Sequence, residues 1–258
     1  MSKQHLANYF KKIQDKEKQL FIPYIMAGDG GLDILNDRIQ FLQDAGAAAV
    51  ELGIPFSDPV ADGNTIQQAG IRALNDDVSL KKVLDTIAPT KQNRDIPIIL
   101  MTYINPIFCY GVETFAADCA ASGVSGIIIP DIPMEEEALI ADALYNHDIA
   151  FIRLAAMTSP KERLEKIAAQ SEGFLYAVSV TGTTGERATH QDRVYEYLAS
   201  LKKHASVPVL AGFGVSTPEQ AHRLGAHCDG VIVGSKIVSM LHEGRDNDVR
   251  VLIEQSIS

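Results

Sequence analysis

The sequence predicts an α/β fold, a single (β/α)8 or TIM barrel that takes up residues 1–258 as one domain. Three observations predict it: eight short apolar runs, helical segments between them, and a near-regular spacing. The starts of successive runs fall 23 to 33 residues apart, except for 49 residues between the second and third. The chain of 258 residues is also the length at which such barrels form one domain.

The apolar runs are expected to be parallel strands. Each is four to six residues long, rich in Val, Ile or Leu, and followed by a polar or glycine-bearing turn. Short runs that are apolar on both faces are typical of a parallel sheet buried on both sides. The runs are Phe21–Met26, Ala48–Leu52, Pro97–Met101, Gly126–Ile129, Ala150–Leu154, Phe174–Val178, Val207–Ala211 and Gly230–Val233.

Segments of helical character separate the runs. Ser159 before Pro160, and Ser216 or Thr217 before Pro218, are typical of helix starts, and Gly46, Gly123 and Gly225 of helix ends. The long gap after the second run fits an extra helix, and Ser2–Ile13 is expected to be an added N-terminal helix. The helical segments are Leu32–Asp44, Thr65–Asn75, Leu80–Ile87, Val112–Ala121, Glu135–His147, Pro160–Ala169, Gln191–His204, Pro218–Leu224 and Asp246–Ile257.

An open, doubly wound sheet is the alternative architecture. It would be favoured by a GxGxxG turn after the first strand, but the sequence there is Ala27-Gly28-Asp29-Gly30-Gly31. No linker, low-complexity stretch or charge block divides the chain. The closed, one-domain barrel is therefore the simpler prediction.

Composition narrows the classes of partner. Lys and Arg number 23 against 33 Asp and Glu, a net charge of −10 that disfavours nucleic acid and anionic membrane. An anionic small molecule would need local donors. The three cysteines form no CxxC pair, which favours a reducing compartment over disulfides or structural zinc. With a polar N-terminus and no apolar run near ~18 residues, the chain is expected to be cytoplasmic.

Two glycine-bearing loops follow the last two runs: Gly212-Phe213-Gly214 and Gly234-Ser235-Lys236. Barrel active sites lie at the carboxyl ends of the strands, and phosphate usually sits after strands seven and eight. Each loop is expected to open a helix or helical turn, which favours an anion. Such turns often contain glycine without any ligand, but the two together indicate a phosphate site. Gly182-Thr183-Thr184-Gly185 could add a third donor edge or serve as a lid.

Two carboxylates are candidate catalytic groups. Glu51 lies inside the apolar run Ala48–Leu52, where an ionised side chain is costly without partners, and burial would raise its pKa. Asp62 lies in the following loop, where capping the next helix is the alternative role. No lysine lies within a strand run and no histidine has a partner at metal-ligand spacing, which disfavours Schiff-base and metal-dependent aldolases. Carboxylate acid–base chemistry on a phosphorylated substrate remains.

The segment Val50–Gln67 closely resembles the signature of the tryptophan synthase alpha chain family. Further motifs follow in the expected order along the whole chain: Phe21-Ile22-Pro23-Tyr24, Ile129-Pro130-Asp131-Ile132-Pro133, Thr184-Gly185, Gly212-Phe213-Gly214 and Gly234-Ser235. The resemblance implies a barrel lyase that cleaves indole-3-glycerol phosphate to indole and glyceraldehyde 3-phosphate. It implies no cofactor or metal in this chain, and a beta chain that carries pyridoxal phosphate and takes up the indole in an α2β2 tetramer.

The resemblance also implies roles for individual residues. Glu51 would handle the proton at C3 of the indole ring and the hydroxyl proton, and Asp62 would accept the ring N–H. Phosphate would be bound by Gly185, Gly214, Gly234 and Ser235, with Phe213 nearby. The remaining positions that would line the substrate pocket are Phe21, Met101, Tyr103, Ile128, Leu154, Tyr176 and Thr184.

Two features complete the expectations. The loop Ile54–Gly63 carries Phe56 and Asp58, which are expected to contact the beta chain, although Phe56 could instead fold back onto the barrel.

Arg153 departs from the apolar pattern of its strand, and alternation predicts that it faces the helix layer. A non-catalytic barrel or another phosphosugar isomerase would be the alternatives to a lyase, but the two carboxylates and the second-loop motif disfavour both.

Overall fold

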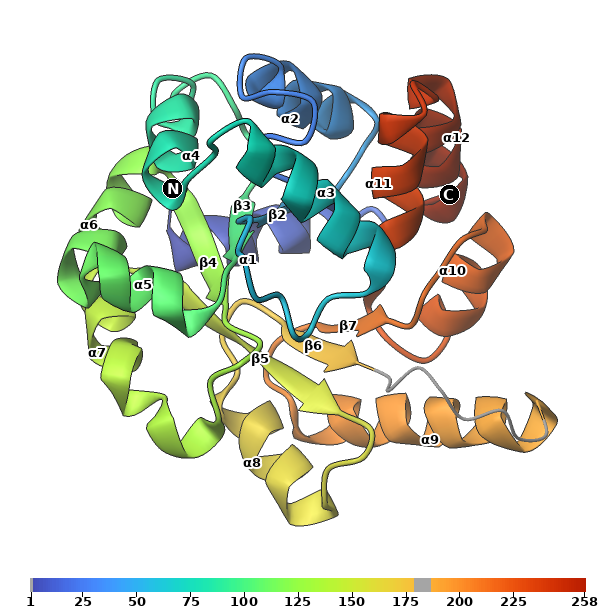
Figure 1. The fold of residues 1–258 in the computed structure, drawn as a ribbon. Coiled ribbons are helices and arrows are strands. Elements are labelled where there is room, and N and C mark those ends of the chain that lie inside the picture. The colour runs from blue at the N-terminus through green and yellow to red at the C-terminus, as the bar shows by residue number, and fades with distance from the viewer. Residues whose placement is uncertain (1, 179–186) are drawn as a thin grey trace.

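A closed barrel of eight parallel strands forms the centre of the molecule in the computed structural model, which describes residues 2–178 and 187–258. Each strand pairs with its neighbours in sequence, and β1 pairs with β8 to close the ring. Figure 1 shows the strands surrounded by helices. The strands are β1 (Leu20–Met26), β2 (Val50–Gly53), β3 (Ile98–Met101), β4 (Val124–Ile128), β5 (Ala150–Ala156), β6 (Leu175–Val178), β7 (Val209–Gly212) and β8 (Gly230–Val233).

The helices that cover the barrel confirm the predicted βα order, with an extra helix after β2 and another before β1. They are α1 (Lys3–Gln14), α2 (Leu35–Asp44), α3 (Asn64–Asn75), α4 (Leu80–Ile87), α5 (Ile104–Tyr110), α6 (Val112–Ser122), α7 (Ala138–Asn146), α8 (Lys161–Gln170), α9 (Arg187–His204), α10 (Pro218–Gly225), α11 (Ser235–His242) and α12 (Asp246–Ser256). A short 3₁₀ turn, η1 (Met134–Glu136), precedes α7.

Two helices were absent from the predicted segments, and both follow a strand directly. The seven-residue α5 buries only Ile107 and has Pro106 in its first turn, so it shows no readable apolar periodicity. Helix α11 begins at Ser235, where the sequence predicts a helical turn, but continues to His242. The loop after β7 was expected to open a helix at once; instead α10 begins at Pro218, and its N-cap Thr217 accepts a hydrogen bond from the Gln220 N–H.

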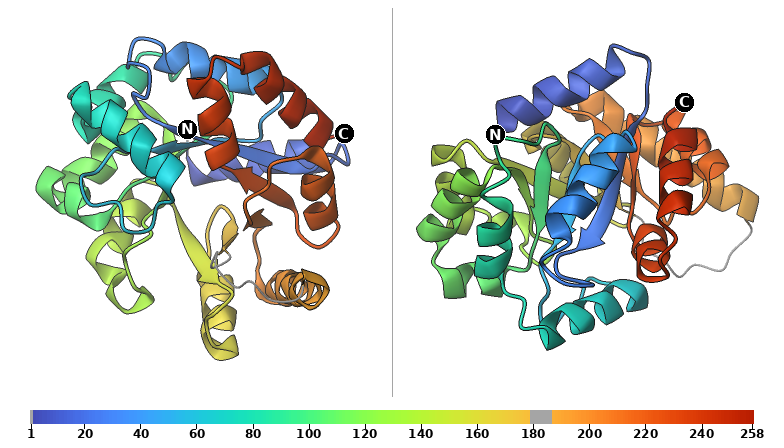
Figure 2. Two further views of the ribbon diagram at one scale, coloured as in Figure 1. Left: turned by 45° about the vertical axis from the view of Figure 1, so that its right-hand side comes forward. Right: turned by 90° about the horizontal axis from the view of Figure 1, so that it is seen from above.

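The inside of the barrel is packed with apolar side chains and is closed at one end by α1. Leu6 and Phe10 of this helix are fully buried against Phe174, in one cluster with Leu20 and Ile22 of β1. In the right-hand view of Figure 2, α1 lies across one end of the barrel. Because this amino-terminal end is sealed by packing, the opposite end, where the strands terminate, is the end available for a site.

Candidate active site

A cavity of about 890 Å³ opens at the carboxyl ends of the strands. Its wall combines apolar side chains with two carboxylates, Glu51 and Asp62. The residues from the strands and from the loops that follow them include Tyr24, Met101, Leu154, Tyr176, Gly214, Gly234 and Ser235. A mostly apolar cavity with a few converging polar groups is the usual form of a small-molecule site.

Glu51 of β2 is the buried acid of this cavity. It lies in register with Tyr24 of β1 and Ile99 of β3, and only 1% of the residue is exposed. Its Oε2 atom is buried and has no hydrogen-bond partner among the described residues. Burial, with a smaller effect from the negative charge of Asp62, raises its pKa from 4.5 to about 8. Glu51 is therefore protonated at neutral pH and can both give and take a proton.

Asp62 reaches the same cavity from the loop between β2 and α3. Burial raises its pKa to about 6, although a hydrogen bond from the Tyr103 side chain acts in the opposite direction. The Tyr103 hydroxyl also accepts a hydrogen bond from the Ala61 N–H at 3.0 Å, so one side chain holds both the loop and the carboxylate. Helix α3 has Gly63 as its N-cap, without a side-chain hydrogen bond. The Asp62 carboxylate is thus not the cap of that helix.

Two tyrosines, buried Tyr24 and partly buried Tyr176, lie near the pair of carboxylates. Burial and the charges of Glu51 and Asp62 raise the pKa of Tyr24 and of Tyr176 well above the ordinary value. Both phenols stay neutral and can donate hydrogen bonds. Glycines at the strand ends make room for them: a Cβ at Gly53 would overlap the Tyr24 hydroxyl, and one at Gly212 would overlap the Tyr176 ring.

The loops after β7 and β8 form another part of the wall. Gly214 has a positive φ of 66°, and a Cβ at this position would meet nothing within 4 Å, so the backbone is open to a ligand. Gly234 is the N-cap of α11 without a side-chain hydrogen bond, and Ser235 begins that helix. A helix N-terminus with free N–H groups suits an anion. We call Gly214, Ser216, Gly234 and Ser235 the anion end of the cavity.

The other expected substrate contacts fall into three groups. Met101, Leu154 and Tyr176 line the cavity, and the Tyr103 side chain hydrogen-bonds to Asp62. Tyr103, Phe21, Ile128 and Phe213 are not among the described residues of the wall, so their contact with the substrate stays a prediction. Thr184 and Gly185 lie outside the described residues.

Phe21, Ile128 and Phe213 pack among other apolar side chains. Phe21 is fully buried in the same apolar cluster as Tyr24, which belongs to the cavity wall. Ile128 is buried inside the barrel in one cluster with Ile22 and Ile152. Phe213 packs against Tyr197 of α9, with ring centroids 6.2 Å apart. Strand alternation favours Tyr24 over Phe21 as the residue that faces the cavity. Lys236 could have been found from its place in the loop Gly234-Ser235-Lys236, which the sequence already indicates as an anion site.

The loop Ile54–Gly63 presents its residues differently from one another. Phe56 is half-buried and its ring lies 5.3 Å from that of Tyr103, so it folds back in part onto the barrel. Asp58 is exposed and accepts a hydrogen bond from the Ser57 hydroxyl. Val60 is the most exposed of the large apolar residues recorded, at 83%.

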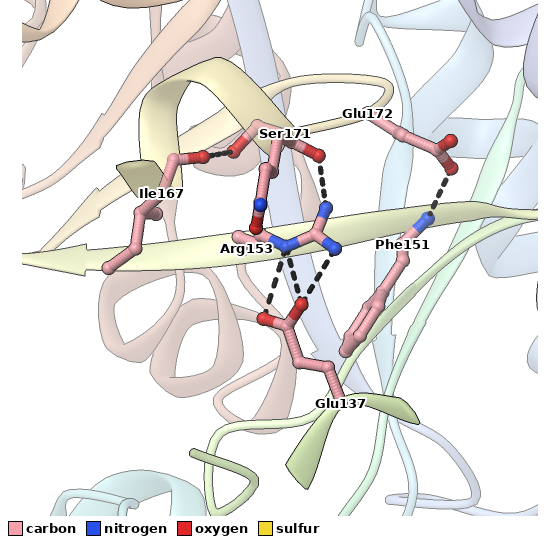
Figure 3. A network of polar contacts seen from close by, with 7 residues as sticks. Glu137, Phe151, Arg153, Ile167, Ser171 and Glu172 are labelled. Atoms are coloured by element: carbon pink, nitrogen blue, oxygen red, sulfur yellow. Dashed lines mark hydrogen bonds and ion pairs between the residues drawn. The ribbon is translucent and has the colours of Figure 1, made fainter. Parts of the chain in front are cut away.

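Arg153 faces the helix layer, as alternation predicts, and its partner is Glu137 at the start of α7. Figure 3 shows the guanidinium beside the Glu137 carboxylate. The nitrogen–oxygen distances of this pair are 2.7 to 3.1 Å, and the guanidinium also donates to the carbonyl oxygen of Gln170. The side chains of Arg153 and Glu137 are only 12% and 13% exposed. The pair ties β5 to the segments on both sides of it.

The fold and the site are typical of one class of protein, the TIM-barrel enzymes whose active site lies at the carboxyl ends of the strands, and the two carboxylates and the anion end suit acid–base chemistry on a small anionic molecule. Within the described residues, no cluster of His, Cys, Asp and Glu could hold a metal ion, and no helix could cross a membrane. Two carboxylates with pKa values displaced toward neutrality in a cleft are typical of acid–base catalysis.

Comparison with known proteins then gives the particular family. The family profile "Tryptophan synthase alpha chain" matches residues 10–257. The chain is 60% identical over 257 residues to the tryptophan synthase alpha chain of Oceanobacillus iheyensis, covering 100% of this chain and 98% of that one. It is 49% identical over 236 residues to that of Bacillus cereus (strain ATCC 14579), covering 92% of each. The chain belongs to the tryptophan synthase alpha chain family.

Solved structures agree with this membership. The tryptophan synthase alpha subunit of Legionella pneumophila str. Paris is similar with a TM-score of 0.89 and 30% identity, covering 99% of this chain and 97% of that one. A chain of Mycobacterium tuberculosis tryptophan synthase is similar with a TM-score of 0.88 and 33% identity, covering 97% and 96%.

Family membership establishes the reaction. The chain is a lyase that cleaves indole-3-glycerol phosphate in tryptophan biosynthesis. The alpha chains of this family are cofactor-free, and pyridoxal phosphate belongs to the beta chain.

Proposed function

We propose that Glu51 and Asp62 are the two catalytic groups of the cleavage. The observation that carries the proposal is Glu51, a residue of the cavity wall whose buried Oε2 has no partner among the described residues and whose carboxyl has a pKa of about 8. A buried polar atom without a partner is costly, so such an atom at a cavity is well placed to receive a ligand. Asp62 enters the same cavity and keeps the lower pKa, about 6.

The pKa difference assigns the proton transfers. Glu51 in its acid form gives a proton to C3 of the indole ring, and Asp62 as a carboxylate accepts the hydrogen bond of the ring N–H and stabilises the positive charge. Ionised Glu51 then takes the proton of the side-chain hydroxyl next to the ring. The hydroxyl oxygen forms a carbonyl, the carbon–carbon bond to C3 breaks, and its electron pair returns to the ring to release neutral indole. The order needs no Schiff base, because the protonated ring is the electron acceptor.

We propose that the phosphate of the substrate binds at the anion end of the cavity. Support comes from the open backbone at Gly214 and from the N-terminus of α11, with Ser235 as a hydroxyl donor. The rest of the wall, including Met101, Leu154 and Tyr176, suits the flat apolar ring. The proposal thus orients the substrate with its ring toward the carboxylates and its phosphate toward β7 and β8.

We further propose that the chain is one domain and works in an α2β2 tetramer with a beta chain in the cytoplasm. The loop Ile54–Gly63 is the proposed docking segment, supported by exposed Asp58 and by Val60. Phe56, half-buried on Tyr103, would connect docking to the residue that holds Asp62. The three cysteines are free, which is consistent with a reducing compartment.

The catalytic assignment is tested by measuring indole release from indole-3-glycerol phosphate by the isolated chain. Glu51→Gln should lower kcat by at least ~10²–10⁴-fold, because general acid–base groups typically contribute that much and Glu51 serves two transfers. Asp62→Asn should also be severe, since an amide cannot offset the positive charge on the ring. Glu254→Gln on the exposed face of α12 is the matched control and should change nothing. A Glu51→Gln enzyme that keeps about a tenth of kcat or more would refute the assignment.

A further inference from the structure

Three cationic residues belong to the described wall of the cavity, and the guanidinium groups of two of them are already neutralised by carboxylates. Arg153 is ion-paired with Glu137 at 2.7 Å, and Arg163 with Glu135 at 2.6 Å. Lys236 has no carboxylate within 4.0 Å in the part of the chain that the structure describes. Lys236 therefore contributes a positive charge to the cavity wall that no described residue cancels.

The position of Lys236 is at the anion end. It is the second residue of α11, directly after Ser235 and about one turn before Ser239. All three residues belong to the cavity wall. Its residue is half-buried. The carboxylate of Glu243 is close enough for Lys236 to lower its pKa weakly, but the partners of Glu243 are Ser239 and Arg245. The ammonium is thus not committed to another contact.

A lysine at this place is unfavourable for the free protein. The N-terminus of a helix carries a partial positive charge, so a cation in the first turn is repelled by about 0.3–1 kcal/mol, whereas an anion is attracted. The first turn of α11 holds Lys236 and no acidic residue. A residue that breaks a local rule at a cavity is a candidate for a role in binding. A bound dianion would turn the repulsion into attraction from both the helix and the ammonium.

The charge of the cavity points the same way. Asp62 adds a negative charge to its wall, whereas Glu51 keeps its proton at neutral pH and Glu137 is paired with Arg153, and the chain as a whole carries a net charge of −10. A phosphate dianion that enters must overcome this field, and the glycine N–H groups of the anion end offer only partial charges. A full positive charge beside them is the missing counterion.

We propose that Lys236 is a further phosphate-binding residue, whose ammonium pairs with the phosphate of the substrate. The proposal rests on the phosphate position proposed above. Because the phosphate takes no part in the bond changes, Lys236 stabilises bound substrate and transition state alike, and its loss should act on KM and not on kcat. A charge-assisted hydrogen bond lost at a half-buried site should raise KM about 5–50-fold.

The experiment compares Lys236→Met with Lys236→Arg and with the control Lys81→Met on α4. Lys81 is exposed, is paired with Asp85 and is not on the cavity wall. The Lys81→Met substitution therefore removes the same charge at a place away from the cavity. In Lys236→Met, the KM for indole-3-glycerol phosphate and the inhibition constant of glycerol 3-phosphate should both rise about 5–50-fold. Both values should largely recover in Lys236→Arg and stay unchanged in Lys81→Met. Inhibition by neutral indole should be the same in all variants. The loss of affinity should shrink as salt is added.

Thermal unfolding gives a readout that does not depend on turnover. Without ligand, Lys236→Met should unfold at the same temperature as the unchanged chain or slightly higher, because the repulsion with the helix is gone. Glycerol 3-phosphate should raise the Tm of the variant less than that of the unchanged chain. A variant with unchanged KM, inhibition and ligand-induced Tm shift overturns the role of Lys236.

A second substitution separates this proposal from the phosphate position on which it rests. Gly214→Asp puts bulk and negative charge at the anion end. If Gly214→Asp lowers the affinity for glycerol 3-phosphate and Lys236→Met does not, the proposed phosphate position is supported and the proposed role of Lys236 is refuted. If neither has an effect, the phosphate lies elsewhere and both proposals fail.

Discussion

At the scale of the residue, the side chain that we assign to the chemistry also opposes folding. Glu51 is buried with one oxygen unpartnered, and its pKa is raised from 4.5 to about 8. Burial of an ionisable group without a partner is tolerated only where something else requires it. The position of the acid thus has a cost in stability, and the cost depends on pH.

The pH dependence of stability follows from the raised pKa. Between pH 4.5 and about 8 the folded chain keeps a proton on Glu51 that the unfolded chain has released, so raising the pH favours unfolding. We predict that Glu51→Gln, which cannot ionise, is as stable as the unchanged chain below pH 4.5 and increasingly more stable toward pH 8. The full displacement corresponds to at most about 5 kcal/mol.

Urea unfolding at pH 4.5, 6.5 and 8 measures this difference. Asp62 is present in both proteins, so its own titration largely cancels in the comparison. Glu254→Gln, at an exposed position, serves as the control and should give no trend with pH. A stability difference between Glu51→Gln and the unchanged chain that does not grow with pH would show that Glu51 is not buried as a neutral acid.

At the scale of the element, a nearly buried ion pair joins the segments around β5. Arg153 of β5 binds Glu137 at the start of α7, as Figure 3 shows, and the last carbonyl of α8. We predict that Arg153→Met destabilises the fold by about 2–4 kcal/mol, because it leaves the Glu137 carboxylate nearly buried without a partner. The double variant Arg153→Met/Glu137→Gln should recover most of the loss. The urea midpoint of unfolding checks both.

The neighbouring pair provides the control for this prediction. Arg163 and Glu135 connect the same two regions, but their side chains are 38% and 64% exposed. Exposed ion pairs contribute little, so Arg163→Met should leave the midpoint almost unchanged. Equal effects of Arg153→Met and Arg163→Met would mean that burial does not set the strength of these pairs.

The same scale shows what the sequence could and could not predict. Apolar runs rich in β-branched residues predicted all eight strands. Because each strand is buried on both faces, it appears in the sequence as a continuous apolar run, whichever strands it pairs with. Alternation within a strand correctly turned Arg153 toward the helices. Its partner could not be predicted, because Glu137 is brought to it by the packing of α7 on β5. Helix α5 was missed because one buried residue gives no period.

For the site, sequence reasoning found the residues whose type is unusual for their place. Glu51 stood out in an apolar run and is on the cavity wall. Phe21 and Phe213 are aromatic residues in places where core and pocket are equally suitable, and both pack against other apolar groups, so their contact with the substrate stays a prediction. Lys236 belongs to the motif Gly234-Ser235-Lys236, but that it forms no ion pair with any described residue is a property of the folded surroundings.

At the scale of the whole molecule, the barrel separates stability from function at its two ends. Helix α1 seals the amino-terminal end with Leu6 and Phe10, and the carboxyl end holds the cavity and the loop Ile54–Gly63. Because Asp62 and the exposed residues Asp58 and Val60 share this loop, a protein that binds the loop acts directly on the active site. Binding of the beta chain at this loop and the proposed catalytic role of Asp62 are therefore expected to affect each other.

The coupling gives a prediction about the complex. A partner that prefers the loop with Asp62 in its working position must shift the population of that state, and a bias of ~1–3 kcal/mol would change affinity by roughly 5–150-fold. Binding is reciprocal, so a ligand of the alpha site should tighten the complex with the beta chain by the same factor. We expect calorimetry with the cognate beta chain to give a tighter complex in the presence of glycerol 3-phosphate. Asp58→Ala and Val60→Ser should weaken the complex, whereas Val251→Ser, which removes an exposed valine from α12, should not. No complex at micromolar concentration, or an affinity that neither the ligand nor the two loop substitutions change, would refute docking through this loop.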